Sequence, residues 1–211
     1  MRKSYLIGGA ALALATVGAA NAEVSLSGNV ALTNDYMWRG VTQSSEDIAI
    51  QGGFDLELDT GFYAGTWASS IAGDADVEVD LYAGYAGAFA EGYGFDVGVI
   101  QYFYPSDGDA DLDFLEVYGG LDQTWGSFGL TEYVYYDPDN ETTYATVGAS
   151  LAVTEAFSVG ANYGKYLDGA GEYYHYDIGA GYSVGGFDFG LSWYEAEDSD
   201  DGITFSIGKS L

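Results

Sequence analysis

Apolar and polar residues alternate with a period of two along most of this chain, in short segments separated by turns. Residues 24–34 read Val-Ser-Leu-Ser-Gly-Asn-Val-Ala-Leu-Thr-Asn, and residues 202–211 read Gly-Ile-Thr-Phe-Ser-Ile-Gly-Lys-Ser-Leu. Each segment has one apolar face and one face of small or polar residues. This pattern predicts β-strands that lie between two different environments.

The sequence contains twelve such segments. Most have the roughly 9 to 11 residues that a tilted strand needs to cross the hydrocarbon layer of a bilayer. They are residues 24–34, 48–58, 62–69, 76–86, 93–104, 113–121, 127–136, 142–153, 157–166, 174–184, 187–194 and 202–211.

The connections between these segments alternate in length. Short turns are expected at 59–61, 91–92, 122–126, 154–156 and 185–186, and longer acidic connections at 35–47, 70–75, 105–112, 137–141, 167–173 and 195–201. Bacterial outer-membrane barrels have short periplasmic turns, longer extracellular loops and an even number of strands. We therefore predict an all-β fold, an antiparallel transmembrane β-barrel of about 12 strands. A secreted soluble β-sandwich that binds a ligand is the alternative, because alternation alone does not say which face is outside.

The first residues have the pattern of a secretory signal peptide. Arg2 and Lys3 precede an apolar run at 5–17, and Ala20-Asn21-Ala22 has the small-x-small pattern of a cleavage site. We predict a signal peptide at 1–22, cleavage near Ala22, and a barrel over 23–211. Export of a barrel of this kind predicts location in the outer membrane of a Gram-negative bacterium.

The chain is strongly acidic. After residue 22 the cations are Arg39, Lys165 and Lys209 against 33 Asp and Glu, a formal charge of 3 − 33 = −30. This charge excludes nucleic acid as a partner. The expected partners are outer-membrane lipid, lipopolysaccharide and a small cationic solute. No cysteine is present, so disulfides cannot stabilise the fold.

Three stretches resemble a known family. Residues 28–43 read Gly-Asn-Val-Ala-Leu-Thr-Asn-Asp-Tyr-Met-Trp-Arg-Gly-Val-Thr-Gln, residues 51–55 Gln-Gly-Gly-Phe-Asp, and residues 61–65 Gly-Phe-Tyr-Ala-Gly. They resemble the Gcw-chp family of exported proteobacterial proteins, with Trp38 in place of phenylalanine and Thr42 in place of serine. The resemblance implies an outer-membrane barrel. It implies no activity or catalytic residue, so none is carried over.

Carboxylates fall on the inner face of the predicted barrel. A ring of them would attract cations, as charged rings do in selective pores. We therefore predict a narrow cation-preferring channel or small-solute uptake route. The alternative is a barrel filled by its own tyrosines, whose acidic loops bind divalent ions, lipopolysaccharide or another surface. The candidate residues for selectivity are Arg39, Asp55, Glu57, Glu78, Asp80, Asp96, Glu116, Asp177 and Asp188.

Arg39 differs from the other candidates because it is the only cation between residues 23 and 164. It lies in the first long connection, beside Tyr36 and Trp38. If this connection folds into the barrel, the guanidinium reaches carboxylates such as Asp55 or Glu57. Arg39 then either constricts the interior or only ties the loop down.

One segment breaks the alternation. Glu132 falls on the same face as Phe128, Leu130 and Val134, which predicts a β-bulge or a different register there.

Two acidic loops are weak candidates for Ca²⁺ or Mg²⁺, and no other cofactor is expected. Neither loop matches the EF-hand pattern. Their candidate ligands are Asp107, Asp109, Asp111, Asp198, Asp200 and Asp201.

Catalysis is not expected. The single histidine, His175, has Asp177 two residues away, and Ser183 is a possible nucleophile for the pair, but the sequence has no Gly-x-Ser-x-Gly and no His-Glu-x-x-His motif. We predict that the protein is not an enzyme.

Overall fold

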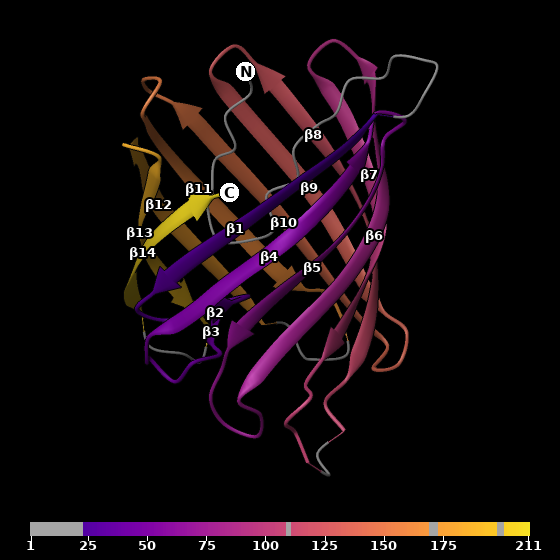
Figure 1. The fold of residues 1–211 in the computed structure, drawn as a ribbon, viewed down its shortest axis with the longest axis vertical. Coiled ribbons are helices and arrows are strands. Elements are labelled where there is room, and N and C mark those ends of the chain that lie inside the picture. The colour runs from indigo at the N-terminus through magenta and orange to yellow at the C-terminus, as the bar shows by residue number, and fades with distance from the viewer. Residues whose placement is uncertain (1–22, 109–110, 169–172, 198–200) are drawn as a thin grey trace.

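The computed structural model describes residues 23–108, 111–168, 173–197 and 201–211, and these residues form a closed antiparallel β-barrel (Figure 1). The predicted signal peptide at 1–22 lies outside the described residues. The barrel strands are β1 (Val24–Thr33), β4 (Ala49–Leu58), β5 (Phe62–Ser70), β6 (Val77–Ala90), β7 (Tyr93–Phe103), β8 (Phe114–Trp125), β9 (Phe128–Asp137), β10 (Thr142–Ala152), β11 (Phe157–Tyr166), β12 (Tyr174–Val184), β13 (Phe187–Ala196) and β14 (Gly202–Ser210).

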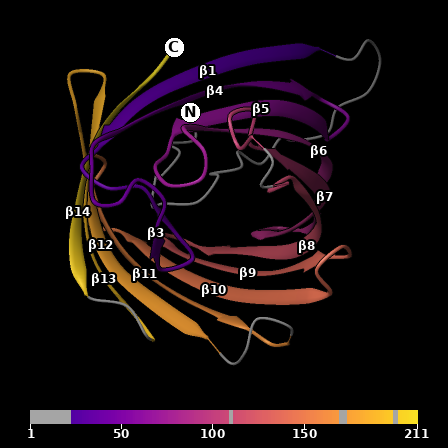
Figure 2. The same cartoon turned by 90° about the horizontal axis from the view of Figure 1, so that it is seen from below.

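These twelve strands pair in sequence order, and β1 closes the ring against β14. The closing contact joins residues 29–33 of β1 to residues 206–210 of β14, whereas β1 pairs with β4 along its whole length. Figure 2 shows the ring from one end, with its interior, here called the bore, enclosed by strands. A single closed sheet confirms the predicted barrel and rules out the two packed sheets of a β-sandwich.

All twelve predicted strands are present, and the largest differences lie at two strand ends. Strand β6 continues to Ala90, with a register shift between Ala88 and Ala90 where it pairs with β7. Strand β8 continues through Trp125, so the turn expected at 122–126 is confined to residues 126–127.

Short turns lie at one end of the barrel and longer connections at the other, as the sequence predicts (Figure 1). In the turn between β12 and β13, Gly185 and Gly186 have φ angles of 62° and 80°. Two consecutive positive φ angles characterise the type I′ turn, whose twist matches that of the paired strands. Glycine adopts them without the steric cost that a side chain would add.

The two faces of the barrel differ sharply in polarity. Large apolar side chains cover the outside, where Phe54 is 59% exposed and Leu191 54%. Carboxylates face the bore, where Asp96 is 1% exposed and Glu116 2%. This arrangement confirms the predicted face assignment and is the one that transmembrane barrels adopt. Among the described residues, no helix is long and apolar enough to cross a membrane.

Glu132 is the exception on the outer face. Strand β9 pairs with β8 and β10 without a register shift, which places Glu132 beside Leu121 and Val147. The predicted bulge is therefore wrong, and the carboxylate does face outward. Its Oε2 atom accepts a hydrogen bond of 3.1 Å from the Gln123 amide, also on the outer face.

Replacing Glu132 with leucine should stabilise the barrel in lipid. A carboxylate in the middle of a lipid-facing strand is costly, so we expect Glu132→Leu to raise the free energy of unfolding by about 1 to 2 kcal/mol. Urea unfolding in phospholipid vesicles measures the difference, and Asp139→Leu in a loop serves as the control. Lower stability of Glu132→Leu would indicate that Glu132 makes a favourable polar contact in the membrane.

Candidate functional site

The first long connection folds into the bore as a small hairpin. Its strands are β2 (Met37–Trp38) and β3 (Val41–Thr42), and we call residues 37–42 the inward hairpin. Figure 2 shows this hairpin inside the ring of strands. From the sequence, only a loop is expected here. The two turn residues, Arg39 and Gly40, have φ angles of 50° and 81°, which makes this a type I′ turn as well.

Gly40 lets the hairpin approach the barrel wall closely. A Cβ atom at this position would lie 2.5 Å from the His175 Cβ on β12 and 2.9 Å from the Ala196 Cβ on β13. Such distances are far below van der Waals contact. The Arg-Gly pair therefore combines a turn that needs positive φ with a wall that leaves no room for a side chain.

Asp35 holds the base of the hairpin. Its side chain is buried, and its Oδ1 atom accepts hydrogen bonds from the Thr42 hydroxyl at 2.6 Å and the Ser44 hydroxyl at 3.0 Å. The Thr33 hydroxyl donates to the Asp35 carbonyl oxygen at 2.7 Å. These bonds tie the hairpin to the end of β1.

Arg39 reaches across the bore from the tip of the hairpin. Its two terminal nitrogens donate to both carboxylate oxygens of Glu116 on β8, at 2.8 and 2.7 Å, and Nη1 also donates to the Tyr166 hydroxyl on β11 at 3.0 Å. The guanidinium carbon lies 4.0 Å from the Tyr144 ring centroid and 4.4 Å from that of Trp38. The side chains of Arg39 and Glu116 are 8% and 2% exposed. A buried, bidentate ion pair walled by aromatic rings therefore connects the hairpin to β8, and the Tyr166 hydroxyl adds a contact to β11.

This pairing corrects one prediction and leaves another open. Arg39 does not pair with Asp55 or Glu57, because the hairpin places it against Glu116 instead. Asp55 accepts a hydrogen bond from the Tyr82 hydroxyl, and Glu57 lies on the same face of β4, next to its last residue. The structure is compatible with both suggested roles of Arg39, since a residue that ties the loop down inside the bore also narrows it.

Further contacts hold the first long connection to β6, β7 and β8. The Tyr36 hydroxyl donates to Glu78 on β6 at 2.8 Å. The Trp38 ring packs edge-on against Tyr102 and Phe114, with centroid distances of 6.1 and 6.2 Å. The connection before β4 is therefore fixed on at least three sides of the bore.

A layer of tyrosines and carboxylates lies on the walls nearer the short turns. The Tyr63 hydroxyl donates to Asp96 at 2.7 Å and also contacts the Tyr118 hydroxyl. The Tyr133 hydroxyl donates to Asp122 at 3.0 Å. These contacts satisfy the buried carboxylates with neutral hydroxyl donors, so the negative charge in this layer is solvated by the wall and not cancelled by cations.

The other predicted bore residues lie on the inner face but do not form one cluster. Asp80 stands on β6 between Glu78 and Tyr82, and Asp177 stands opposite Asn162 of β11. Asp188 lies near the short-turn end of β13 and accepts a hydrogen bond of 2.5 Å from Ser183.

The residues considered for catalysis are not assembled. The His175 Nε2 atom is 2.7 Å from the Tyr144 hydroxyl, and the Ser183 hydroxyl is engaged with Asp188. The structure therefore brings His175 to a tyrosine of the bore wall and Ser183 to a carboxylate on the neighbouring strand.

The predicted metal loops are described only in part. Asp107 caps its own loop by accepting from the Leu112 amide at 2.9 Å, and Asp201 accepts from the Trp193 indole at 3.3 Å. Asp111 has a positive φ of 52°. Asp109, Asp198 and Asp200 lie outside the described residues. Among the residues that are described, no three His, Cys, Asp or Glu side chains are grouped to hold a metal ion.

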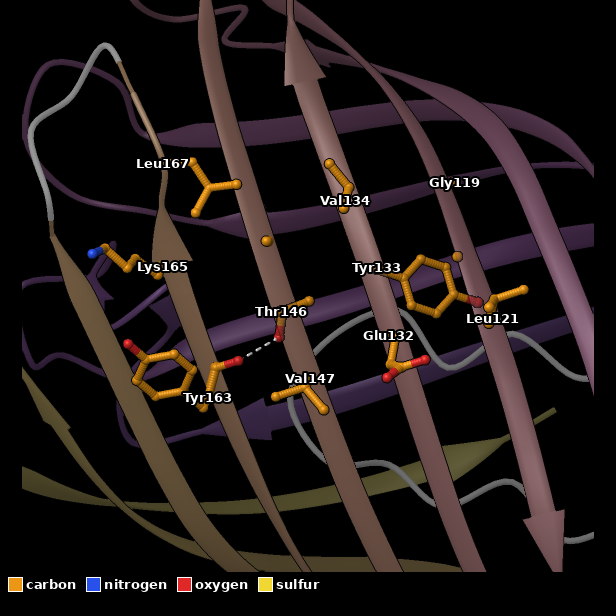
Figure 3. A pocket seen from close by; sticks show the side chains of 12 residues that line it. Gly119, Leu121, Glu132, Tyr133, Val134, Thr146, Val147, Tyr163, Lys165 and Leu167 are labelled. Atoms are coloured by element: carbon orange, nitrogen blue, oxygen red, sulfur yellow. Dashed lines mark hydrogen bonds between the residues drawn. The ribbon is translucent and has the colours of Figure 1, made fainter.

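The outer wall has a groove of about 650 Å³ beside Glu132 (Figure 3). Leu121, Val134 and Val147 border it, and the small residues Gly119 and Ala145 leave it open. Because these side chains belong to the apolar outer face, the groove suits lipid acyl chains and is separate from the bore.

Sequence reasoning missed the residues that complete the Arg39 site. Tyr144 and Tyr166 contact Arg39 from β10 and β11, far away in the chain. One local signal for the hairpin was present, since Arg39-Gly40 lies between Met37-Trp38 and Val41-Thr42, and Trp, Val and Thr are residues that favour strands. An X-Gly pair between such residues is typical of a two-residue hairpin turn.

Comparison with known proteins supports both the family and the fold. A family model described as a bacterial protein of unknown function, Gcw_chp, matches residues 17–208, which confirms the resemblance seen in residues 28–65. A search of curated proteins found no match.

Solved structures with the same fold include outer-membrane channels. The KdgM porin matches with a TM-score of 0.65 and 10% identity, over 88% of this chain and 98% of the porin. The NanC porin matches with a TM-score of 0.60 and 9% identity, over 89% and 99%. An outer membrane channel from Pseudomonas putida F1 matches with a TM-score of 0.55 and 12% identity, over 95% and 97%. At these identities the likeness shows the fold.

Removing the counter-charge of Arg39 should destabilise the protein. Glu116→Gln leaves the buried guanidinium without its carboxylate, and we expect the free energy of unfolding to fall by about 3 kcal/mol. The double variant Arg39→Gln/Glu116→Gln should lose less than the sum of the two single losses. Urea unfolding followed by tryptophan fluorescence measures all three, with Asp188→Asn as the control for loss of a bore carboxylate. Additive losses would mean that the pair is not coupled.

Proposed function

We propose that this chain, which belongs to the Gcw_chp family of bacterial proteins, forms an outer-membrane channel for small solutes and prefers cations. The closed barrel with an apolar exterior supports a membrane location, as does the likeness of its fold to the KdgM and NanC porins. The predicted signal peptide, with cleavage near Ala22, is consistent with this location.

The charge of the bore wall is the observation that carries the proposed preference for cations. Glu78, Asp96 and Glu116 are each at most 2% exposed and face the bore. Among the described residues, Arg39 is the only Lys or Arg that lies in the bore, and Glu116 already neutralises it. Lys165 and Lys209 belong to the outward rows of β11 and β14. The bore is therefore negative, which attracts cations and repels anions.

The wall charge argues against an anionic solute. The KdgM porin has a structure in complex with disordered oligogalacturonate, a chain of sugar anions. Bore carboxylates without a cationic partner, such as Glu78 and Asp96, would repel such an anion here. We propose that the solute of this barrel is a small cation or a neutral molecule.

Neutralising bore carboxylates should weaken the preference for K⁺ over Cl⁻. In planar bilayers with a KCl gradient, the wild-type protein should show a cation-selective reversal potential. We expect Asp55→Asn/Glu57→Gln to lower the K⁺/Cl⁻ permeability ratio roughly twofold, because both residues face the bore. The control is Asp139→Asn/Glu91→Gln, which removes two charges outside it.

Two checks make this experiment decisive. Each preparation must first show the faster gel mobility of an unboiled barrel and must come from the outer-membrane fraction. A folded wild-type protein that favours Cl⁻, or that is indifferent to the sign of the ion, would refute the cation preference.

The inward hairpin supports a second candidate, a barrel that its own loop keeps closed. The ion pair of Arg39 and Glu116 spans the bore, and aromatic rings surround it. In this form the acidic loops would be the functional surface, binding divalent ions or lipopolysaccharide.

Loosening the hairpin distinguishes these two candidates. We expect Arg39→Ala to raise single-channel conductance, because it releases the hairpin from Glu116 and Tyr166. A silent wild type with a conducting Arg39→Ala variant would favour the closed barrel. Equal conductance of the two proteins would show that the hairpin does not limit flow. Asp35→Asn, which keeps Arg39 but weakens the base of the hairpin, is the matched second variant.

A further inference from the structure

One carboxylate of the bore lacks the compensation that its neighbours have. Asp80, on β6, is 9% exposed, and its Oδ1 atom has no hydrogen-bond partner among the described residues. Burying an ionised carboxylate without a partner is costly. A positive charge at this point would remove the cost.

Among the described residues, Arg39 is the only Lys or Arg inside the bore. Arg39 is committed to Glu116, whose Oε2 atom also accepts from the Tyr102 hydroxyl at 3.1 Å. Glu78, two residues before Asp80, accepts from the Tyr36 hydroxyl, which is neutral. The three carboxylates Glu78, Asp80 and Glu116 therefore share one positive charge, and no cation among the described residues neutralises Asp80 when it is ionised.

Aromatic side chains flank Asp80 on both neighbouring strands. The register places Trp67 of β5 and Tyr102 of β7 directly opposite Asp80 on the same face of the sheet. The Tyr36 ring packs edge-on against Trp67, at 5.2 Å between centroids, and Trp38 of the inward hairpin packs against Tyr102. Tryptophan and tyrosine rings attract cations through the negative potential of their faces. Phe114 stacks on one face of Tyr102, at 4.3 Å between centroids, which leaves Trp67 and the other side of Tyr102 as the aromatic neighbours of an ammonium ion at Asp80.

We propose that Asp80, Trp67 and Tyr102 form a binding site for a small primary ammonium ion beside the inward hairpin. The ammonium donates to Asp80, and its carbon substituent lies against the aromatic rings. This inference rests on the proposed cation-preferring channel and names the class of solute that the channel takes. Such a site would bind an organic ammonium ion more strongly than K⁺. Both ions carry the same charge, but the carbon substituent of the ammonium ion also contacts the aromatic rings.

Methylammonium is the probe that tests the site. The thermal unfolding midpoint of the full protein in detergent is measured against methylammonium chloride and against KCl at equal ionic strength. The wild type should be stabilised saturably by methylammonium and less by K⁺. Asp80→Asn should abolish this difference, whereas Asp188→Asn, which removes a bore carboxylate away from Trp67, should keep it. Equal stabilisation by the two ions, or an unchanged difference in Asp80→Asn, would overturn the proposal.

A second pair of variants tests the aromatic part. Trp67→Leu should raise the half-saturating concentration of methylammonium about tenfold, and Trp67→Phe should raise it less. An unchanged value in Trp67→Leu would contradict the aromatic contact. If Asp80→Asn gives no heat-modifiable form, the wild-type comparison and the Trp67 variants still decide the question.

The reversal potential of the same preparations separates this inference from the channel itself. A cation-selective wild type that does not distinguish methylammonium from K⁺ refutes the ammonium site and leaves the channel standing. Saturable, Asp80-dependent stabilisation in a barrel without cation selectivity supports the site and refutes the proposed cation preference of the channel.

Discussion

In a sheet that closes on itself, every strand residue points either outward or into the bore. This division into two faces determines where every other side chain and loop of the structure can lie. Backbone groups in hydrocarbon must be paired within the protein, so a transmembrane sheet has to close. Closure here depends on the short contact between residues 29–33 and 206–210. Once the ring is formed, apolar residues such as Phe54 and Leu191 cover its outside, and Asp, Glu and Tyr gather within it.

The bore in turn decides how the first long connection folds. An arginine with positive φ is strained, by about 1 kcal/mol or more. The bidentate pair with Glu116 and the ring of Tyr144 at 4.0 Å offset this strain, because both act in an environment that excludes water. The position of the hairpin therefore depends on contacts with the barrel wall as well as on its own turn residues.

The strands follow from local sequence and the hairpin from contacts with the closed barrel, and this difference explains what could be predicted from the sequence. Alternation at period two is local, so all twelve strands were found, and errors arose at ends such as Trp125, where Gln123-Thr124-Trp125 resembles a turn. The partner of Arg39 was missed because Glu116 is 77 residues away and comes close only through the curvature of the sheet. Glu132 shows the opposite error, since a correct strand assignment was doubted because its side chain violates the polarity of the outer face. The local sequence pattern predicts which face of the sheet a residue occupies. Contacts across the bore cannot be predicted in this way, because they form only when the sheet has closed into a ring.

The contacts of Arg39 with the bore carboxylates also affect how strongly the proposed channel would hold a cation. Conduction requires a site that attracts an ion yet releases it. In the proposed channel, Glu78 and Asp80 are the carboxylates beside the hairpin that Arg39 does not neutralise, so an ammonium ion bound at one of them leaves the other available to the next cation. Arg39 limits the depth of this well, because without it the same three carboxylates would hold cations more strongly. A single arginine fixed beside an excess of acids thus narrows the bore and moderates its charge.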